Sequence, residues 1–211
     1  MSKAISSDRS APAVHVVDDD AAMRAALDSL FRSVGYTTFT YGSAAEFMNA
    51  GQAGAAGCLV LDIRLPGKNG LEFQEQLASV GVTMPVILMT GHGDIPMSVR
   101  GMKAGAIDFL PKPFREQDML DAVAAALRQD ETRRAERSKD LELRERLATL
   151  SPREQQVMAR VATGRMNKQI AFDLGLSEIT VKIHRGNAMR KMGARNLAEF
   201  IKMAEALELK E

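Results

Sequence analysis

The stretch Cys58-Leu59-Val60-Leu61-Asp62-Ile63-Arg64-Leu65-Pro66-Gly67 decides how the first half of this 211-residue chain is read. Its apolar run ends on the carboxylate of Asp62 and is followed by turn residues. That pattern is typical of a strand buried on both faces of a parallel sheet. Asp62 is therefore expected at the C-terminal end of the strand, the edge at which open α/β sheets hold their ligands.

Three other predicted strands end in polar residues. The strand over 14–17 runs into the aspartates 18–20, the strand over 85–89 runs into Thr90, and the strand over 106–110 is followed by Lys112 between two prolines. Carboxylates, a hydroxyl and an ammonium group at one sheet edge favour phosphoryl and metal chemistry at Asp62. For a single aspartate a helix cap or a turn is the simpler interpretation, but four such strand ends make it improbable.

A carboxylate that accepts a phosphoryl group forms an acyl phosphate, and it needs a nearby cation to neutralise the phosphoryl oxygens. Mg²⁺, or Mn²⁺ in its place, takes oxygen ligands. Asp18 or Asp19, together with Asp62 and the backbone carbonyl of Arg64, can supply them. Asp20 stands one residue further along and is predicted to cap the helix that follows.

Thr90, Lys112 and Phe109 complete this predicted site. Thr90 offers a hydroxyl donor, and Lys112 offers a positive charge for the phosphoryl oxygens. Core packing is the simpler role for Phe109, and a rotamer switch that follows Thr90 is the alternative. His92 lies between glycines and is interpreted as a loop residue, and His15 as a core or edge histidine.

The alternation of strands and helices predicts an α/β domain with a doubly wound, five-stranded parallel sheet and right-handed crossovers. A polar arm over 1–12 is expected to precede this domain as disordered chain. Strands are expected over 14–17, 37–41, 58–62, 85–89 and 106–110, and helices over 21–34, 44–49, from 70 onward, over 95–104 and from 116 to 127.

Residues 128–148 predict a charged helical linker, because the apolar stripe of the preceding helix disappears there. Leu120, Leu127 and Leu141 keep a heptad interval, which Arg134 interrupts. Two interpretations stay open, a solvated helix that joins two domains and a weak dimeric coiled coil. Three acidic–basic pairs have favourable i,i+4 spacing: Asp130 with Arg134, Asp140 with Arg144, and Glu142 with Arg146.

Residues 149–211 predict an all-α domain. Ser151, Pro152 and Glu154 fit the N-cap, the first position and the capping box of a helix that ends near Gly164. Further helices are expected over 167–174, 177–192 and 197–207. The short turn at Gly175 between the second and third of these four helices is typical of a helix-turn-helix.

The third helix of this domain is predicted to read DNA. Val181, Ala188 and Met192 fall on one face and are expected in the core, whereas the opposite face is basic and carries an isoleucine. An exposed isoleucine among cations suits a thymine methyl group in the major groove, and a solvated basic face is the alternative. The candidate DNA contacts are Asn167, Lys168 and Thr180 for phosphates, and Lys182, Ile183, Arg185, Asn187 and Arg190 on the recognition helix.

Charge is divided unevenly along the chain, although the net charge is +1. Residues 11–125 contain 8 basic against 13 acidic residues, and residues 151–211 contain 11 basic against 7 acidic ones. An acidic first half suits a cation site, and a basic second half suits a polyanion. No run is apolar enough for a membrane span and the N-terminal residues are too polar for a secretory signal, so we expect a cytoplasmic protein with no membrane partner.

Seven segments together resemble the FixJ/NarL family of two-component response regulators. Four are similar to a flavodoxin-like receiver domain: Val17-Asp18-Asp19-Asp20, Leu61-Asp62-Ile63-Arg64-Leu65-Pro66, Thr90-Gly91-His92-Gly93-Asp94 and Phe109-Leu110-Pro111-Lys112-Pro113-Phe114. Three are similar to a LuxR-type helix-turn-helix: Leu150-Ser151-Pro152-Arg153-Glu154, Asn167-Lys168-Gln169-Ile170-Ala171 and Thr180-Val181-Lys182-Ile183-His184. Gly186 departs from the NarL-like pattern, which has a basic residue there, so the base code must differ.

The resemblance implies that Asp62 takes a phosphoryl group from a sensor histidine kinase. It further implies that Asp18 and Asp19 help to hold Mg²⁺, that Thr90 and Lys112 sense the product, and that phosphorylation favours a homodimer through the face formed by residues 95–127. The dimer is expected to bind promoter DNA and to act on RNA polymerase, without enzymatic activity beyond slow autodephosphorylation. The implied domains are a disordered arm (1–12), a phospho-receiver (13–127), a charged helical linker (128–148) and a LuxR-type helix-turn-helix domain (149–211).

Two rival interpretations stay open. Residues 17–20 and 86–90 also match the Asp-x-Asp motif and the second motif of haloacid-dehalogenase-type phosphohydrolases, in which Asp18 would be the nucleophile and Asp62 dispensable. The basic helix-turn-helix and the placement of Lys112 argue against that enzyme. The second rival is an atypical regulator that binds DNA without phosphorylation, which the complete set of acceptor-site residues disfavours.

Overall fold

The computed structural model describes residues 12–91 and 95–209. The expectations for the arm up to residue 11 and for His92, Gly93 and Asp94 therefore lie outside the described residues. The chain divides into two compact units, Met1–Arg133 and Arg134–Glu211. Among the described residues, no helix is long and apolar enough to cross a membrane.

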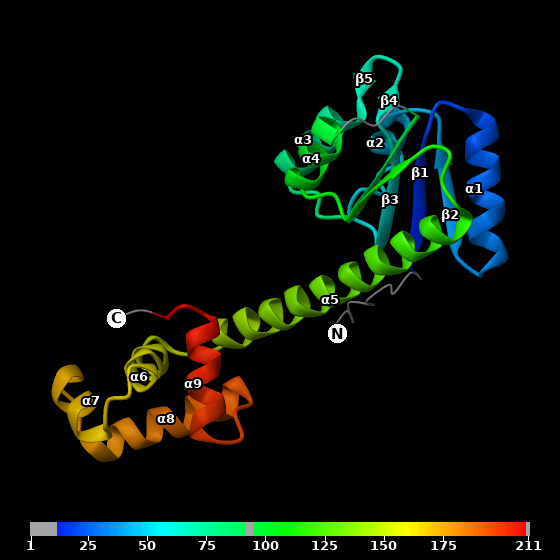
Figure 1. Ribbon diagram of the computed structural model, residues 1–211. Coiled ribbons are helices and arrows are strands. Elements are labelled where there is room, and N and C mark those ends of the chain that lie inside the picture. The colour runs from blue at the N-terminus through cyan, green and yellow to red at the C-terminus, as the bar shows by residue number, and fades with distance from the viewer. Residues whose placement is uncertain (1–11, 92–94, 210–211) are drawn as a thin grey trace. The chain divides into compact units, whose positions relative to one another are not determined.

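A five-stranded parallel sheet forms the centre of the first unit (Figure 1). Its strand order β2-β1-β3-β6-β7 is that of a doubly wound, flavodoxin-like sheet, so the predicted fold class is confirmed. The parallel register places Val17 beside Leu61 and Asp62 beside Met89, so the C-terminal ends of β1, β3 and β6 share one edge. The strands are β1 (Ala13–Val17), β2 (Thr37–Tyr41), β3 (Gly57–Asp62), β6 (Val86–Thr90) and β7 (Asp108–Pro111).

Helices cover both faces of this sheet (Figure 1). One face packs around Phe31 and Val123 beneath α1 and the first part of α5, and the other packs around Phe47 and Phe73 beneath α2, α3 and α4. Burial on both faces explains why β3 is apolar throughout until it reaches Asp62. The helices are α1 (Ala21–Ser33), α2 (Ala44–Asn49), α3 (Gly70–Ser79), α4 (Ile95–Lys103) and α5 (Glu116–Ala148).

Two local features differ from the sequence-based expectation. A short antiparallel hairpin, β4 (Arg64–Leu65) with β5 (Lys68–Asn69), follows β3 and was not predicted, because strands of two residues have no periodicity to detect. β7 begins at Asp108, later than expected, because the N–H of Ala106 still donates to the Gly101 carbonyl at the end of α4 (3.1 Å).

The predicted linker is helical and continues the preceding helix without a break, since α5 covers Glu116–Ala148. The predicted ion pairs of Asp140 with Arg144 and of Glu142 with Arg146 are present, at 2.8 Å and 2.7 Å. Leu120 and Leu127 pack against the core of the first unit, whereas Leu141 is exposed.

The second unit contains the predicted helix-turn-helix domain together with the last part of α5. Ser151 and Glu154 form the predicted capping box at the start of α6. Gly175 ends α7 in the left-handed conformation (φ 63°), and Ser177 caps α8 by accepting from the Thr180 N–H. The helices are α6 (Pro152–Ala162), α7 (Asn167–Leu174), α8 (Glu178–Met192) and α9 (Leu197–Ala206).

Candidate functional site

Three carboxylates meet at the C-terminal edge of the sheet. Asp18 and Asp19 follow β1, Asp62 ends β3, and one oxygen of each lies within 4.8 Å of the others. Asp18 and Asp62 are buried, whereas Asp19 is exposed to solvent. An acidic cluster of oxygen donors in a receiver-like sheet edge is typical of a divalent-metal site.

Lys112 lies between two of these carboxylates. Its Nζ is 2.7 Å from Asp18 Oδ2 and 2.7 Å from Asp62 Oδ2. The backbone places it there, because the N–H of Lys112 donates to the Thr90 carbonyl (2.7 Å) and so extends the pairing of β7 with β6. The Lys112–Pro113 peptide bond is cis. The structure thus brings together charges that are 94 and 50 residues apart in the sequence.

Burial and charge act on this cluster in opposite directions. Burial raises the pKa of Asp18 above its ordinary value, and the hydrogen bonds from Lys112 and from the Asp20 N–H only partly offset it. Burial alone would lower the pKa of Lys112, but its contacts with Asp18 and Asp62 outweigh that effect and raise it. Lys112 therefore stays protonated. The excess negative charge around buried Asp18 fits a cation at this edge.

Backbone hydrogen bonds hold the acidic residues in place. Asp18 Oδ1 accepts from the Asp20 N–H (2.9 Å), and Asp62 Oδ1 accepts from the Arg64 N–H (3.1 Å). Asp20 caps α1 through the Ala22 N–H (2.8 Å), as predicted. Sequence reasoning missed Arg24, whose Nη1 donates to the Asp18 carbonyl (2.6 Å) and fixes the turn between β1 and α1.

Thr90 and Phe109 occupy adjacent strands. Thr90 is fully buried at the end of β6, beside Pro111 of β7. Phe109 of β7 lies opposite Leu88, which precedes Thr90 by two residues in β6. Phe109 packs against the core beneath α4. The packing role of Phe109 is thus present in the structure, and its role as a rotamer switch stays a prediction.

An open cleft of about 590 Å³ is lined by Asp19, the exposed carboxylate of the cluster. Its walls come from the residue after β3, the β4–β5 hairpin, α3 and α4. The lining residues are Asp19, 63–67, Asn69, Glu72 and Met97. The hairpin that sequence reasoning missed is therefore one wall of the candidate site.

The outer face of α8 carries the predicted DNA contacts. Val181, Ala188 and Met192 are buried, as expected, and Ile183 is 57% exposed on the opposite side. Lys182, Gly186 and Arg190 are exposed with Ile183, and Arg185 and Asn187 are half-buried at the margins. The helix therefore has the two faces that the sequence predicted.

Hydrogen bonds connect the candidate DNA contacts to one another. Arg185 Nη1 donates to Asn167 Oδ1 at the start of α7 (3.1 Å), and Arg190 Nη2 donates to Asn187 Oδ1 (2.5 Å). The Thr180 hydroxyl is 2.8 Å from that of Ser177. The start of α7, where Lys168 is exposed, thus lies against the basic face of α8.

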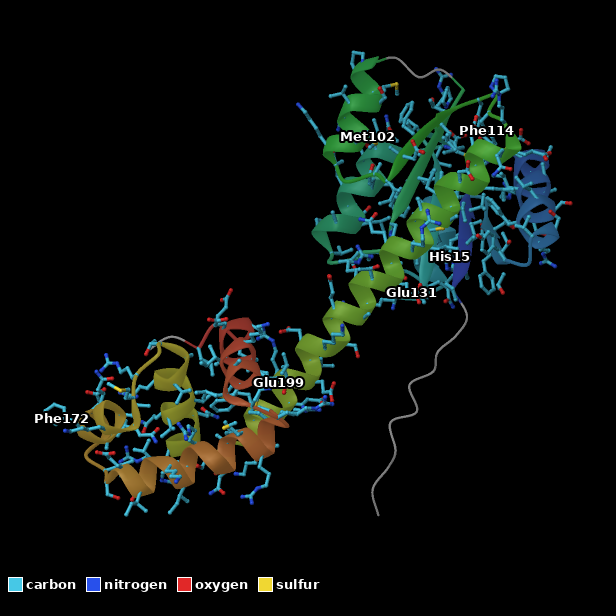
Figure 2. All side chains as sticks on the ribbon, turned by 60° about the horizontal axis from the view of Figure 1, so that its bottom comes forward. His15, Met102, Phe114, Glu131, Phe172 and Glu199 are labelled. Atoms are coloured by element: carbon cyan, nitrogen blue, oxygen red, sulfur yellow. The ribbon has the colours of Figure 1, made fainter. Side chains whose placement is uncertain are left out.

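Sequence reasoning did not identify Phe172, which is 89% exposed and points away from its unit (Figure 2). Because its neighbours Ile170 and Ala171 are buried, the helical spacing of α7 was the signal that could have placed Phe172 on the exposed face. Arg165, Lys168, Gln169 and Asp173 surround it in a shallow pocket.

Both units match known protein families. Residues 14–124 match the family described as "Response regulator receiver domain", and residues 148–204 match "Bacterial regulatory proteins, luxR family". Nodulation protein W of Bradyrhizobium diazoefficiens is 55% identical over 194 residues, covering 92% of this chain and 86% of that protein. Response regulator protein TodT of Pseudomonas putida is 45% identical over 202 residues, covering 96% and 88%.

Solved structures agree with these matches. The response regulator StyR has a TM-score of 0.83 and 47% identity, covering 92% of this chain and 98% of that one. Full-length FixJ from B. japonicum has a TM-score of 0.57 and 36% identity, covering 96% and 100%. These relatives are transcriptional regulators rather than enzymes, so the phosphohydrolase interpretation is not retained. The chain belongs to the FixJ/NarL-type response regulators, which join a receiver domain to a LuxR-type DNA-binding domain and regulate transcription in a phosphorylation-dependent way.

Proposed function

We propose that Asp62 is the phosphoacceptor and that its phosphorylation by a histidine kinase controls promoter binding. The observation that carries the proposal is Lys112 Nζ, held between Asp18 and Asp62 at the sheet edge. In the transfer, an Asp62 oxygen forms a bond to phosphorus while the bond from phosphorus to the kinase histidine breaks. The products are an aspartyl phosphate and a free imidazole.

We infer that Mg²⁺, or Mn²⁺ in its place, is the cation of this site. Asp18, Asp19, Asp62 and the backbone carbonyl of Arg64 would hold it. The cation supplies positive charge to the phosphoryl oxygens. The cluster of three carboxylates, whose negative charge exceeds the positive charge of Lys112, supports a divalent cation there.

Lys112 and Thr90 respond to the new group. Lys112 Nζ can donate to phosphoryl oxygens the hydrogen bonds that it now donates to Asp18 and Asp62. Thr90 ends β6, the strand that pairs with β3. Movement of Thr90 towards the phosphoryl group opens space for Phe109 to change rotamer beneath α4. The receiver thereby shifts between two packings, which is how a local charge alters a distant face.

The phosphorylated receiver favours a homodimer, and two helix-turn-helix units then bind half-sites about one helical turn apart on promoter DNA. In this proposal the α8 face lies in the major groove. Asn167, Lys168 and Thr180 contact phosphates, and Lys182, Ile183, Arg185, Asn187 and Arg190 read or approach the bases. The bound dimer acts on RNA polymerase to regulate transcription.

Intact mass after incubation with acetyl phosphate and Mg²⁺ tests the acceptor. We expect a gain of one phosphoryl group for the parent chain and for Asp28→Asn, a control at a half-buried aspartate of α1 that pairs with Arg32, but not for Asp62→Asn. Sedimentation of the same samples should show dimers only where the mass has increased. A mass gain that survives Asp62→Asn would refute this assignment, and a phosphorylated monomer would refute the dimer.

A further inference from the structure

The buried stripe of α5 ends in a carboxylate. Met119, Val123 and Ala126 pack under the sheet, and the next position of the stripe is Asp130, which is only 2% exposed. Glu131, the following residue, is exposed on the outside of the helix (Figure 2). A buried carboxylate is costly unless it is hydrogen-bonded, so Asp130 must have a specific partner.

That partner is the strand that carries Asp62. Asp130 Oδ2 accepts from the N–H of Gly57, the first residue of β3 (3.0 Å), and Asp130 Oδ1 accepts from Arg133 (3.1 Å). Gly57 has φ 146°, and a Cβ there would overlap the carbonyl of Ala13 in β1. The strand therefore starts with a glycine whose N–H is fixed in position for Asp130. We call this hydrogen bond the receiver-end contact.

The pKa of the Cys58 thiol is raised to about 12, first by burial and then by the negative charge of Asp130. The receiver-end contact lies three residues beyond residue 127, the predicted end of the receiver. The first unit accordingly holds α5 as far as Arg133.

A second polar contact holds the other end of α5 within the second unit. Arg146 Nη1 donates to the carbonyl of Met192, the last residue of α8 (2.7 Å), while Nη2 pairs with Glu142 (2.7 Å). The last carbonyls of a helix have no partner within the helix, and a cation there also complements the helix dipole. Leu143 and Leu147 pack on the same core. We call the bond from Arg146 to Met192 the recognition-end contact.

We propose that α5 transmits the state of the receiver to α8, and that transmission requires both the receiver-end contact and the recognition-end contact. The proposal rests on the proposed function, because it assumes that phosphorylation alters DNA binding. Between the two contacts, residues 134–142 stay helical although nearly all of them are exposed. A helix passes on a small displacement only if neither end slides on the unit that holds it, and hydrogen bonds with fixed geometry oppose that sliding.

The test uses the full chain and a DNA duplex selected by the parent protein from a random-sequence pool. The measured quantity is the ratio of DNA affinities with and without acetyl phosphate and Mg²⁺, with phosphorylation followed by intact mass. We expect Asp130→Ala and Arg146→Ala to accept the phosphoryl group as the parent does. The affinity ratio should fall about fivefold or more in each.

Each variant has a matched control on the same helix. Glu131→Ala removes a neighbouring carboxylate, and Arg144→Ala removes a neighbouring guanidinium that pairs with Asp140. Both controls should keep the parental ratio.

Asp130→Asn retains an oxygen acceptor for the Gly57 N–H and should recover most of the affinity ratio. Hydrogen exchange at the Gly57 amide should accelerate in Asp130→Ala but not in Glu131→Ala.

The outcomes separate this inference from the proposed function. If the DNA affinity of the parent does not change on phosphorylation, the proposed function fails and this inference fails too. If the parent responds and both Asp130→Ala and Arg146→Ala respond equally well, only this inference is overturned. Should Asp130→Ala not fold, Arg146→Ala decides the question, because its side chain is partly exposed and its loss leaves Leu143 and Leu147 packed.

Discussion

Replacing Lys112 by methionine keeps most of the buried aliphatic chain but removes the charge between Asp18 and Asp62. Each carboxylate oxygen is 2.7 Å from Nζ, and at an effective dielectric constant of about 20 each attraction amounts to about 6 kcal/mol before desolvation. The cost of removing these charges from water offsets most of that attraction. Removing one partner of a buried ion pair costs about 3–5 kcal/mol in practice. Because the Lys112 side chain is still 17% exposed, we expect Lys112→Met to lose about 3 kcal/mol of unfolding free energy, the lower end of that range.

Urea unfolding in EDTA measures this loss. Both tyrosines of the chain lie in the first unit and there is no tryptophan, so tyrosine fluorescence reports on the receiver alone. Lys103→Met, at an exposed lysine of α4, is the matched control and should change stability little. Mg²⁺ should reduce the deficit of Lys112→Met, because a divalent cation replaces the missing positive charge.

The stability deficit of Lys112→Met is also expected to depend on pH. Burial already raises the pKa of Asp18, and without Lys112 it rises further. The folded state then binds more protons than the unfolded state, so the deficit should shrink as the pH falls from 7 towards about 4. Parental stability in EDTA, or a deficit that responds neither to Mg²⁺ nor to pH, would refute the electrostatic account of this site.

Three further predictions concern other parts of the chain. Gly57→Ala should destabilise the receiver by about 3 kcal/mol or more in the same fluorescence assay, because the added Cβ overlaps β1; parental stability would contradict the geometry of β3. The hydrogen bond from Lys191 lowers the pKa of Glu154, so this group stabilises the second unit above its unfolded pKa and that stability is lost as the pH falls through the folded pKa. Unfolding of Glu154→Gln followed by circular dichroism should show a stability of the second unit that depends less on pH in that acid range. A pH dependence equal to that of the parent would count against this role of Glu154. In DNA titrations, Lys168→Ala should weaken binding to all duplexes and reduce the salt slope by about one, whereas Ile183→Ala should weaken only the selected site; the reverse pattern would exclude the proposed groove contact.

The sequence by itself determined the class of fold and indicated the acidic, hydroxyl and lysine side chains of the candidate site. Hydrophobic runs that end at Asp62, Thr90 and Lys112 are local signals, because a strand buried on both faces must be apolar until it reaches the sheet edge. Helix caps are equally local, since Asp20 and Ser151 each bond to N–H groups two or three residues away. Local chemistry of this kind is readable without knowing how distant segments pack.

Only the tertiary structure decided which of these groups meet. Whether Asp18 or Asp19 contacts Lys112 depends on the pairing of strands far apart in the chain, and buried Asp18 is the one that does. Asp130 looked like one charge among many in a solvated linker, yet it hydrogen-bonds to Gly57, 73 residues away. Arg146 likewise reaches the last carbonyl of α8, at Met192. Charges in a helix have the same sequence pattern whether they face water or a backbone group of another element, so only the fold distinguishes the two.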